Sequence, residues 1–245
     1  MRVLVTRDYR TMSRHAAQIV ADAVRLEPGL RLGLPTGNTP LGMYEELVRK
    51  HSDEKLDLSG VQTFNLDEYI GLAPGHPGSY HAYMHLHFFE HVHVPVERIH
   101  IPGGAPGMDT GLESTCYEQA IHRAGGIDLL IVGIGSNGHI AFNEPGSSFA
   151  SRTRMVDLAA ETRANARRYF ASEDEVPRQA ITVGIGTILE ARRILLLASG
   201  SGKASAVARA LQGPVSEDMP ASALQRHPDV TAIVDEAAAK EFRTL

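Results

Sequence analysis

Short apolar segments alternate with longer amphipathic segments along almost the whole of this 245-residue chain. Apolar runs such as residues 30–34 and 127–132 have the length of buried strands, and the segments between them have the period of helices. Strands that alternate with helices form parallel sheets with helices on both faces. We therefore predict an α/β fold with a single doubly wound, mostly parallel sheet. Because no linker or repeat divides the chain, residues 1–245 are expected to form one domain.

Caps and helix breakers predict where the elements begin and end. Ser13, Thr39 and Ser79 are the expected helix N-caps, and Pro40 fits the first helical turn. The expected strands are residues 2–6, 30–34, 61–66, 99–101, 127–132, 179–183, 193–197 and 230–234. The expected helices are residues 13–26, 39–51, 79–91, 109–124, 202–211 and 236–243, with a short one between the strands at 179–183 and 193–197.

The composition narrows the class of protein. A hydrophobic content of 43% and a charged content of 22% are typical of soluble globular proteins, and the net charge of −5 argues against nucleic acid as a partner. No apolar stretch reaches membrane-spanning length, and the first residues are too few and too charged for a signal peptide. Cys116 is the one cysteine, so a reducing compartment is expected. We expect a cytoplasmic protein with no membrane partner.

Four loops that follow predicted strands are rich in groups that bind ligands. Each, taken alone, is compatible with an ordinary capped turn or a solvated surface. Because ligands of such sheets bind outside the carboxyl ends of the strands, the four loops are expected to meet at one site. They are Thr36-Gly37-Asn38-Thr39, residues 64–72 with Asp67, residues 133–145 with His139 and Glu144, and residues 199–203 with Lys203.

The residue types in these loops favour a sugar or acyl site with an anionic substrate. His139 and Glu144 place an acid/base pair in one short loop, where glycines allow the backbone to approach a ligand closely. Backbone N–H groups at a helix start, together with Lys203, suit a phosphate group. An arginine could complete the anion site by bidentate contact. The candidates are Arg152, Arg154, Arg163, Arg167 and Arg168.

The sequence also suggests two other kinds of site, one for a dinucleotide cofactor and one for a metal. Residues 133–138 satisfy the G-x-G-x-x-G pattern of dinucleotide sites, and Asp157 lies near the distance expected of a ribose ligand. However, turn residues at 143–146 leave no room for the helix that such a site needs. Histidines at 81, 85, 87, 91, 93 and 100 suggest a metal, but the helical pairs point in different directions and lack further ligands. We expect neither a cofactor nor a metal.

The four loops together resemble the glucosamine-6-phosphate deaminase family. The resemblance rests on residues 34–40, 64–69, 135–145 and 151–154, and extends from the first strand to about Val234. It implies conversion of glucosamine 6-phosphate and water to fructose 6-phosphate and ammonia, without a cofactor. It also implies that Asp67 is the C2 base, that His139 opens the ring with support from Glu144, and that Arg168, Lys203 and the loop of Thr36, Gly37, Asn38 and Thr39 bind the phosphate.

Two positions depart from the family pattern. Some members carry aspartate where this chain has Asn137, which can orient an imidazole by hydrogen bonding but cannot stabilise its charge. Hexameric, allosterically activated members carry a lysine where this chain has Val156, two residues after Arg154. A monomer or small homo-oligomer without that activation is therefore expected. The alternatives are a related sugar-phosphate lactonase, which needs no C2 base, and a sugar-phosphate sensor, which would need a DNA-binding segment.

Overall fold

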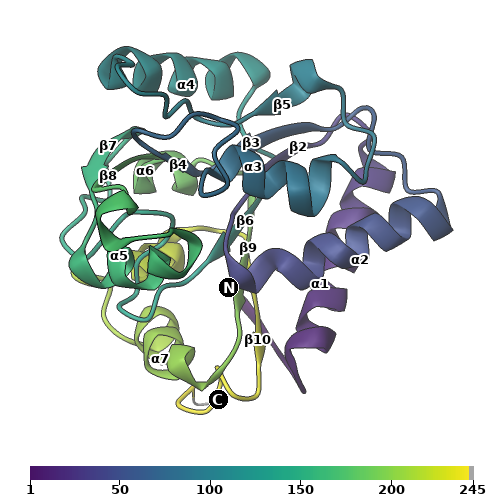
Figure 1. Ribbon diagram of the computed structural model, residues 1–245. Coiled ribbons are helices and arrows are strands. Elements are labelled where there is room, and N and C mark those ends of the chain that lie inside the picture. Colours follow the sequence, from purple (N-terminus) through teal and green to yellow (C-terminus); the bar gives the residue numbers. More distant parts are fainter. Residues whose placement is uncertain (243–245) are drawn as a thin grey trace.

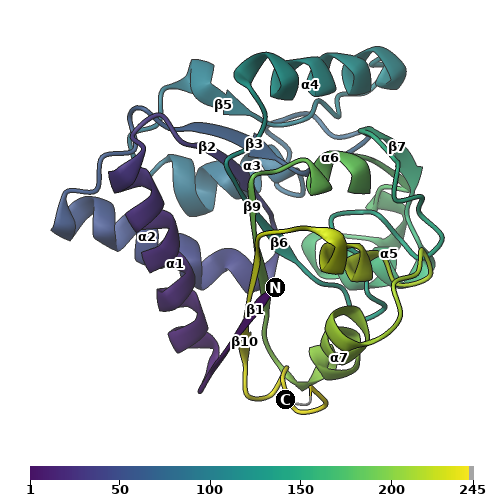
Figure 2. The ribbon, with the colours of Figure 1, turned by 180° about the vertical axis from the view of Figure 1, so that it is seen from behind.

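A seven-stranded sheet forms the centre of the computed structural model, which describes residues 1–242 (Figures 1 and 2). The strand order is β1-β10-β9-β6-β2-β3-β5, and all neighbouring strands are parallel. The predicted mostly parallel α/β fold is thus confirmed. The strands are β1 (Arg2–Thr6), β2 (Arg31–Leu34), β3 (Gln62–Asn65), β5 (Ile99–His100), β6 (Leu129–Gly133), β9 (Arg193–Ala198) and β10 (Val230–Asp235).

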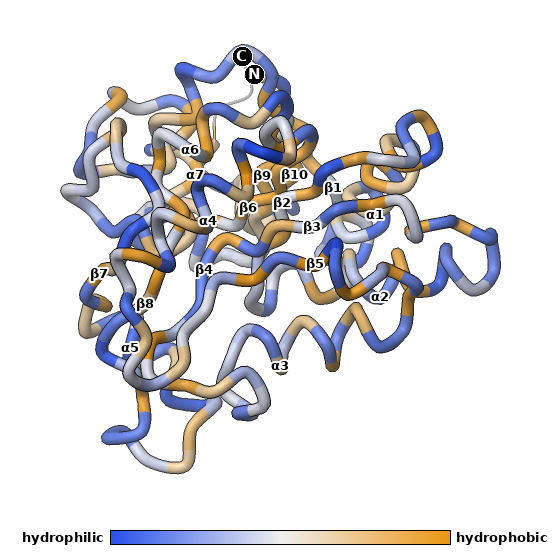
Figure 3. Tube along the Cα trace, turned by 90° about the horizontal axis from the view of Figure 1, so that it is seen from above, coloured by the Kyte–Doolittle hydropathy of each residue, from blue (hydrophilic) through white to orange (hydrophobic). Residues whose placement is uncertain are grey.

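Helices cover both faces of this sheet, as predicted. Along β6, Leu130 and Val132 contribute to the hydrophobic core on one face, whereas Leu129 and Ile131 contribute to the core on the other. The central strands are accordingly the most apolar part of the chain trace (Figure 3). One face is covered by α1 (Tyr9–Leu26), α2 (Asn38–Glu54), α3 (Tyr80–Met84) and the π-helical turn η1 (His85–Phe89), and the other by α4 (Thr110–Ala124), α6 (Ile185–Leu189) and α7 (Ala204–Gln212).

A second, three-stranded antiparallel sheet was not predicted. It has the order β4-β8-β7, with β4 at Asp67–Tyr69, β8 at Gln179–Thr182 and β7 at Arg154–Asp157. The predicted strand at 179–183 therefore exists, but it lies outside the parallel sheet. The other short elements are α5 (Ala160–Ala166), η2 (Val96–Arg98), η3 (Arg167–Tyr169), η4 (Glu173–Glu175), η5 (Ser201–Lys203) and η6 (Pro220–Arg226).

Several helix boundaries differ from the prediction. The N-cap of α1 is Asp8, whose carboxylate accepts a hydrogen bond from Thr11 N at 2.8 Å, so Ser13 lies inside the helix. The N-cap of α2 is Gly37 rather than Thr39, because the φ of 100° at Gly37 lets the helix begin two residues earlier than a Thr39 cap would. The predicted cap Ser79 is confirmed, and Asp109, predicted as the first residue of its helix, is the N-cap of α4.

Two predicted helices differ from the structure. The helix predicted at 79–91 stops at Met84 and continues as the π-helical turn η1. The helix predicted at 236–243 is wrong, because residues 236–241 form turns in which Asp235 accepts a hydrogen bond from Ala238 N at 2.8 Å. Residue 243 lies outside the described residues.

The strand order brings the four predicted loops together. They follow β9, β6, β2 and β3, which are consecutive neighbours in the sheet. The chain leaves β2 towards β3 but leaves β6 towards β9, in the opposite direction, so β2 and β6 flank a switch point of the sheet. A crevice forms outside the carboxyl ends of strands at such a point.

Candidate active site

A cavity of about 560 Å³ opens at this edge of the parallel sheet. Of the ten residues predicted for the site, eight line the cavity, and Asn137 and Glu144 lie directly behind His139. The eight are Thr36, Gly37, Asn38, Thr39, Asp67, His139, Arg168 and Lys203.

Asp67 is the first residue of β4, and one residue, Leu66, separates it from the end of β3. Its side chain is buried, and its surroundings include the aromatic Tyr69 and Tyr80. Burial, and to a lesser degree the neighbouring Glu68, raises the pKa of Asp67 to about 8. Glu68 is itself held by hydrogen bonds from Tyr80 N and His81 N at 2.9 Å each. A poorly solvated carboxyl at a cavity wall is suited to proton abstraction.

The loop after β6 holds an imidazole beside a carboxylate. His139 Nδ1 lies 3.4 Å from Glu144 Oε2, which is at the outer limit of a hydrogen bond. Asn137 Nδ2 donates to Glu144 Oε2 at 2.7 Å, and Thr162 Oγ1 donates to Glu144 Oε1. Although burial raises the pKa of Glu144, the neighbouring His139 imidazole and hydrogen bonds from Thr162 and Asn137 outweigh it and hold that pKa at about 2. Glu144 is therefore a carboxylate anion facing His139.

Asn137 acts on this loop differently from the expectation. Its Oδ1 accepts from the backbone N of His139 at 3.1 Å, and its amide nitrogen contacts Glu144, so it orients the imidazole through the backbone and the carboxylate. Gly135 is required beneath the ring, since a Cβ there would lie 2.3 Å from His139 Cε1. Ala141, which also lines the cavity, has a φ of 49°, a rare conformation for a residue with a side chain.

Two cationic side chains, those of Arg168 and Lys203, also line the cavity. Burial lowers the pKa of Lys203, as expected of an ammonium group drawn partly out of water. The Asn38 amide oxygen faces Arg168 Nη2 at 2.7 Å, and its nitrogen faces the Tyr169 hydroxyl at 2.8 Å. Of the candidate arginines, Arg168 lines this cavity, whereas Arg152 pairs with Glu190 and Arg154 donates to Asn143 Oδ1 at 2.9 Å.

Asp235 and Thr162 are contributors that the sequence did not reveal. Asp235, at the end of β10, accepts hydrogen bonds from Ser199 Oγ at 2.5 Å and from Gly200 N at 3.1 Å, and so holds the loop that carries Lys203. Its place at a strand end was visible in the sequence. Thr162 lies on the short helix α5, which was not predicted, so nothing in the sequence connected it to Glu144.

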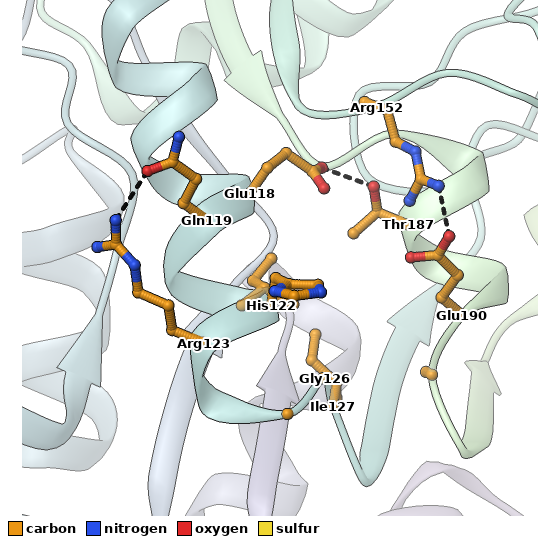
Figure 4. A pocket seen from close by; sticks show the side chains of 12 residues that line it. Glu118, Gln119, His122, Arg123, Gly126, Ile127, Arg152, Thr187 and Glu190 are labelled. Carbon is orange, nitrogen blue, oxygen red and sulfur yellow. Dashed lines mark hydrogen bonds and ion pairs between the residues drawn. The ribbon is translucent and has the colours of Figure 1, made fainter.

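A second hollow, of about 650 Å³, lies between α4 and α6 (Figure 4). Glu118 Oε1 accepts there from Thr187 Oγ1 at 2.6 Å and from Thr153 Oγ1 at 2.7 Å, and Arg152 pairs with Glu190. These contacts join α4 and α6 to the segment before β7. Of the residues considered for the site, this hollow holds only the candidate arginine Arg152, which is paired with Glu190, and it contains none of the predicted catalytic residues, so it is not the candidate active site.

Neither a membrane span nor a metal cluster emerges from the described chain. Within residues 1–242 no helix combines the length and apolarity needed to cross a bilayer, and no three histidine, cysteine or acidic side chains gather as metal ligands. His81, one of the six histidines considered, contacts Glu68 at 2.8 Å. Residues 138–153 contain no helix, so the dinucleotide site weighed from the glycine pattern lacks its essential element.

Comparison with known proteins assigns the chain to a family. The sequence profile of glucosamine-6-phosphate isomerases/6-phosphogluconolactonase matches residues 8–233. The chain belongs to this isomerase/lactonase family. Among similar members, glucosamine-6-phosphate deaminase of Halothermothrix orenii is 53% identical over 239 residues, covering 98% of this chain and 99% of the relative. The deaminase of Bacillus velezensis is 50% identical, with the same coverage of both chains.

Solved structures of the family agree with this assignment. A monomeric glucosamine-6-phosphate deaminase superposes with a TM-score of 0.96 and 48% identity, covering 98% of this chain and 100% of that chain. The 6-phosphogluconolactonase of Trypanosoma cruzi superposes with a TM-score of 0.77 at 18% identity, covering 99% and 97%. The lactonase likeness shows the shared fold alone.

Proposed function

We propose that this protein converts glucosamine 6-phosphate and water to fructose 6-phosphate and ammonia. One observation carries the proposal: a buried carboxyl with a raised pKa and an imidazole–carboxylate pair line or adjoin one cavity that the cationic side chains of Arg168 and Lys203 also line. The reaction balances with substrate and water alone. The high identity to named deaminases supports the same conclusion.

Ring opening is assigned to His139. The closed pyranose must lose the O1 proton and gain one on the ring oxygen, which suits an imidazole. The carboxylate of Glu144, 3.4 Å away, stabilises the protonated ring. Asn137 and Thr162 donate to that carboxylate and hold it in place. Because Glu144 supplies the negative charge and Asn137 supplies a hydrogen bond, the chain functions with asparagine where some relatives carry aspartate.

Isomerisation is assigned to Asp67. Its carboxylate takes the C2 proton to form an enolamine and returns the proton to C1, after which water hydrolyses the resulting imine and releases ammonia. Both transfers occur on one face of a planar intermediate, so a single base suffices. The burial of Asp67 supports this role, since a desolvated carboxylate is a stronger base.

The phosphate is assigned to Lys203, Arg168 and the loop of residues 36–39. The chain has a net charge of −5, so an anionic substrate needs local cationic side chains such as these. We further propose that residues 1–245 act as one domain in the cytoplasm, as a monomer or small homo-oligomer, and that nucleic acid and membranes are not partners. The monomeric state of a 48% identical deaminase supports the first oligomeric form.

The deciding assay is release of ammonia from glucosamine 6-phosphate by purified protein treated with a chelator. We expect turnover in the wild type and its loss in Asp67→Asn. The related lactonase activity is the second candidate, because the family profile includes both classes. Hydrolysis of 6-phosphogluconolactone, retained in Asp67→Asn and without ammonia release from the amino sugar, would establish the lactonase instead.

A further inference from the structure

Three tyrosine hydroxyl groups donate to the carbonyl groups of the loop that joins β2 to α2. Tyr44 Oη donates to Pro35 O at 2.5 Å, Tyr83 Oη donates to Gly37 O at 2.6 Å, and Tyr9 Oη donates to Asn38 O at 3.0 Å. The three tyrosines come from α2, α3 and α1, so separate helices converge on four consecutive residues. We call Tyr9, Tyr44 and Tyr83 the tyrosine clamp.

The geometry of the peptide bond turns these contacts into an orientation of N–H groups. In a trans peptide the carbonyl of one residue and the N–H of the next point in opposite directions. Fixing the carbonyls of Pro35, Gly37 and Asn38 therefore turns the N–H groups of Thr36, Asn38 and Thr39 to the other side of the loop. Asn38 and Thr39 begin α2, where N–H groups have no intrahelical acceptor.

We propose that the tyrosine clamp consists of positioning residues that aim the N–H groups of Thr36, Asn38 and Thr39 at the substrate phosphate. This inference rests on the proposed function, which places a phosphate at this end of the cavity. Tyr9 and Tyr44 do not line the cavity, and Tyr83, which does, has its hydroxyl engaged with Gly37 O. They act by holding the loop in its phosphate-binding conformation before the substrate arrives, which removes a cost of ordering from binding.

Two further observations fit this role. Tyr44 is fully buried, and burial raises the pKa of Tyr44 and of Tyr83 above the ordinary tyrosine range, so both hydroxyls stay protonated donors. The Tyr9 hydroxyl also accepts from Gly42 N at 2.8 Å. It therefore bridges Gly42 N and Asn38 O, an i, i+4 pair in the first turn of α2. Replacing tyrosine by phenylalanine removes these contacts while keeping the ring.

The test is to measure phosphate binding and steady-state kinetics in Tyr9→Phe, Tyr44→Phe and Tyr83→Phe. We expect the Kd for inorganic phosphate, by calorimetry, and the KM for glucosamine 6-phosphate to rise about threefold to tenfold per variant, with little change in kcat. Tyr117→Phe is the matched control. The Tyr117 hydroxyl is also buried and donates to backbone carbonyls, of Asn65 at 2.7 Å and His100 at 3.1 Å, outside the phosphate loop.

The outcomes separate the inference from the proposed function. An unchanged phosphate Kd in all three variants, or an equal rise in the Tyr117→Phe control, overturns the clamp while leaving the deaminase proposal intact. Tyr9 is partly exposed, so Tyr9→Phe remains informative if the buried variants fold poorly. A wild-type protein that binds no phosphate and releases no ammonia overturns the proposed function and the clamp together.

Discussion

At the scale of single residues, Asp67 couples activity to stability. Its carboxyl is buried beside aromatic rings, so its pKa is raised to about 8, far above the value of an exposed aspartate. A base must be deprotonated to act, whereas the folded protein prefers this group protonated. The same burial that strengthens the base therefore destabilises the fold wherever the base is active.

We expect kcat/KM to rise with pH through about 8, as Asp67 in the free enzyme loses its proton. The folded state should lose stability from about pH 4 up to about pH 8 and lose no more above that, because in this interval folded Asp67 holds a proton that unfolding releases. Asp67→Asn should lower kcat by about 10²–10⁴-fold and raise the free energy of unfolding above pH 8 by about 1–3 kcal/mol. Initial rates and urea denaturation across pH check both. Wild-type exchange of the C2 proton with solvent in this variant would exclude Asp67 as the base.

His139 is expected to matter before the C2 step. His139→Gln should slow turnover of the closed pyranose by about 10²-fold or more. It should leave the binding of an open-chain analogue, 2-amino-2-deoxyglucitol 6-phosphate, nearly unchanged, because a linear sugar needs no ring opening. Stopped assays measure turnover of the pyranose, and calorimetry measures binding of the open-chain analogue. Equal losses in turnover and analogue binding would make His139 a binding residue.

At the scale of elements, the loops of the site are fixed by contacts from behind. Asp235 on β10 holds the start of the loop that carries Lys203. Asp235→Asn replaces one of the carboxylate oxygens that accept from Ser199 Oγ and Gly200 N by an amide nitrogen, which cannot accept. The KM for glucosamine 6-phosphate should therefore rise about threefold to tenfold, while kcat changes less. Asp229→Asn, an exposed change just before the same strand, is the control. Steady-state kinetics of both variants check this, and a fall in kcat without a change in KM would contradict it.

Element types followed from the sequence more readily than their boundaries and partners. The apolar runs at β6 and β9 are long enough to identify buried strands, and the loops after them carried His139 and Lys203. The three residues of β4 pair with β8 more than 100 positions away, and no local pattern encodes that pairing. Asp8 was missed as a cap because Ser13 fits the same local rule equally well.

At the scale of the whole molecule, the switch point between β2 and β6 explains why distant loops form one site. Regulation is a property of this scale as well. Val156 on β7 supplies no cation, and the guanidinium of Arg154 is engaged with Asn143 and with Ser147, at 2.9 and 3.4 Å. An effector anion would thus find little differential contact between two states.

We therefore expect hyperbolic kinetics, and no change in rate when N-acetylglucosamine 6-phosphate is added at low substrate. Rates over a substrate series, with and without this compound, and the mass in solution by light scattering check the expectation. Sigmoidal kinetics made hyperbolic by the compound would show that Arg154 and its neighbours suffice as an effector site.

The position of β10 affects how the nascent chain folds during its synthesis. The edge strand β1 is the first to be synthesised, yet its neighbour in the sheet is β10, the last. As the ribosome builds the chain from its N-terminus, β1 must wait until residues 230–235 have emerged before it can join the sheet. Asp235 arrives with them and fixes the loop of Lys203. A ribosome-stalled chain ending before residue 230 should therefore bind no phosphate, so that completing the fold and completing the site are one late event.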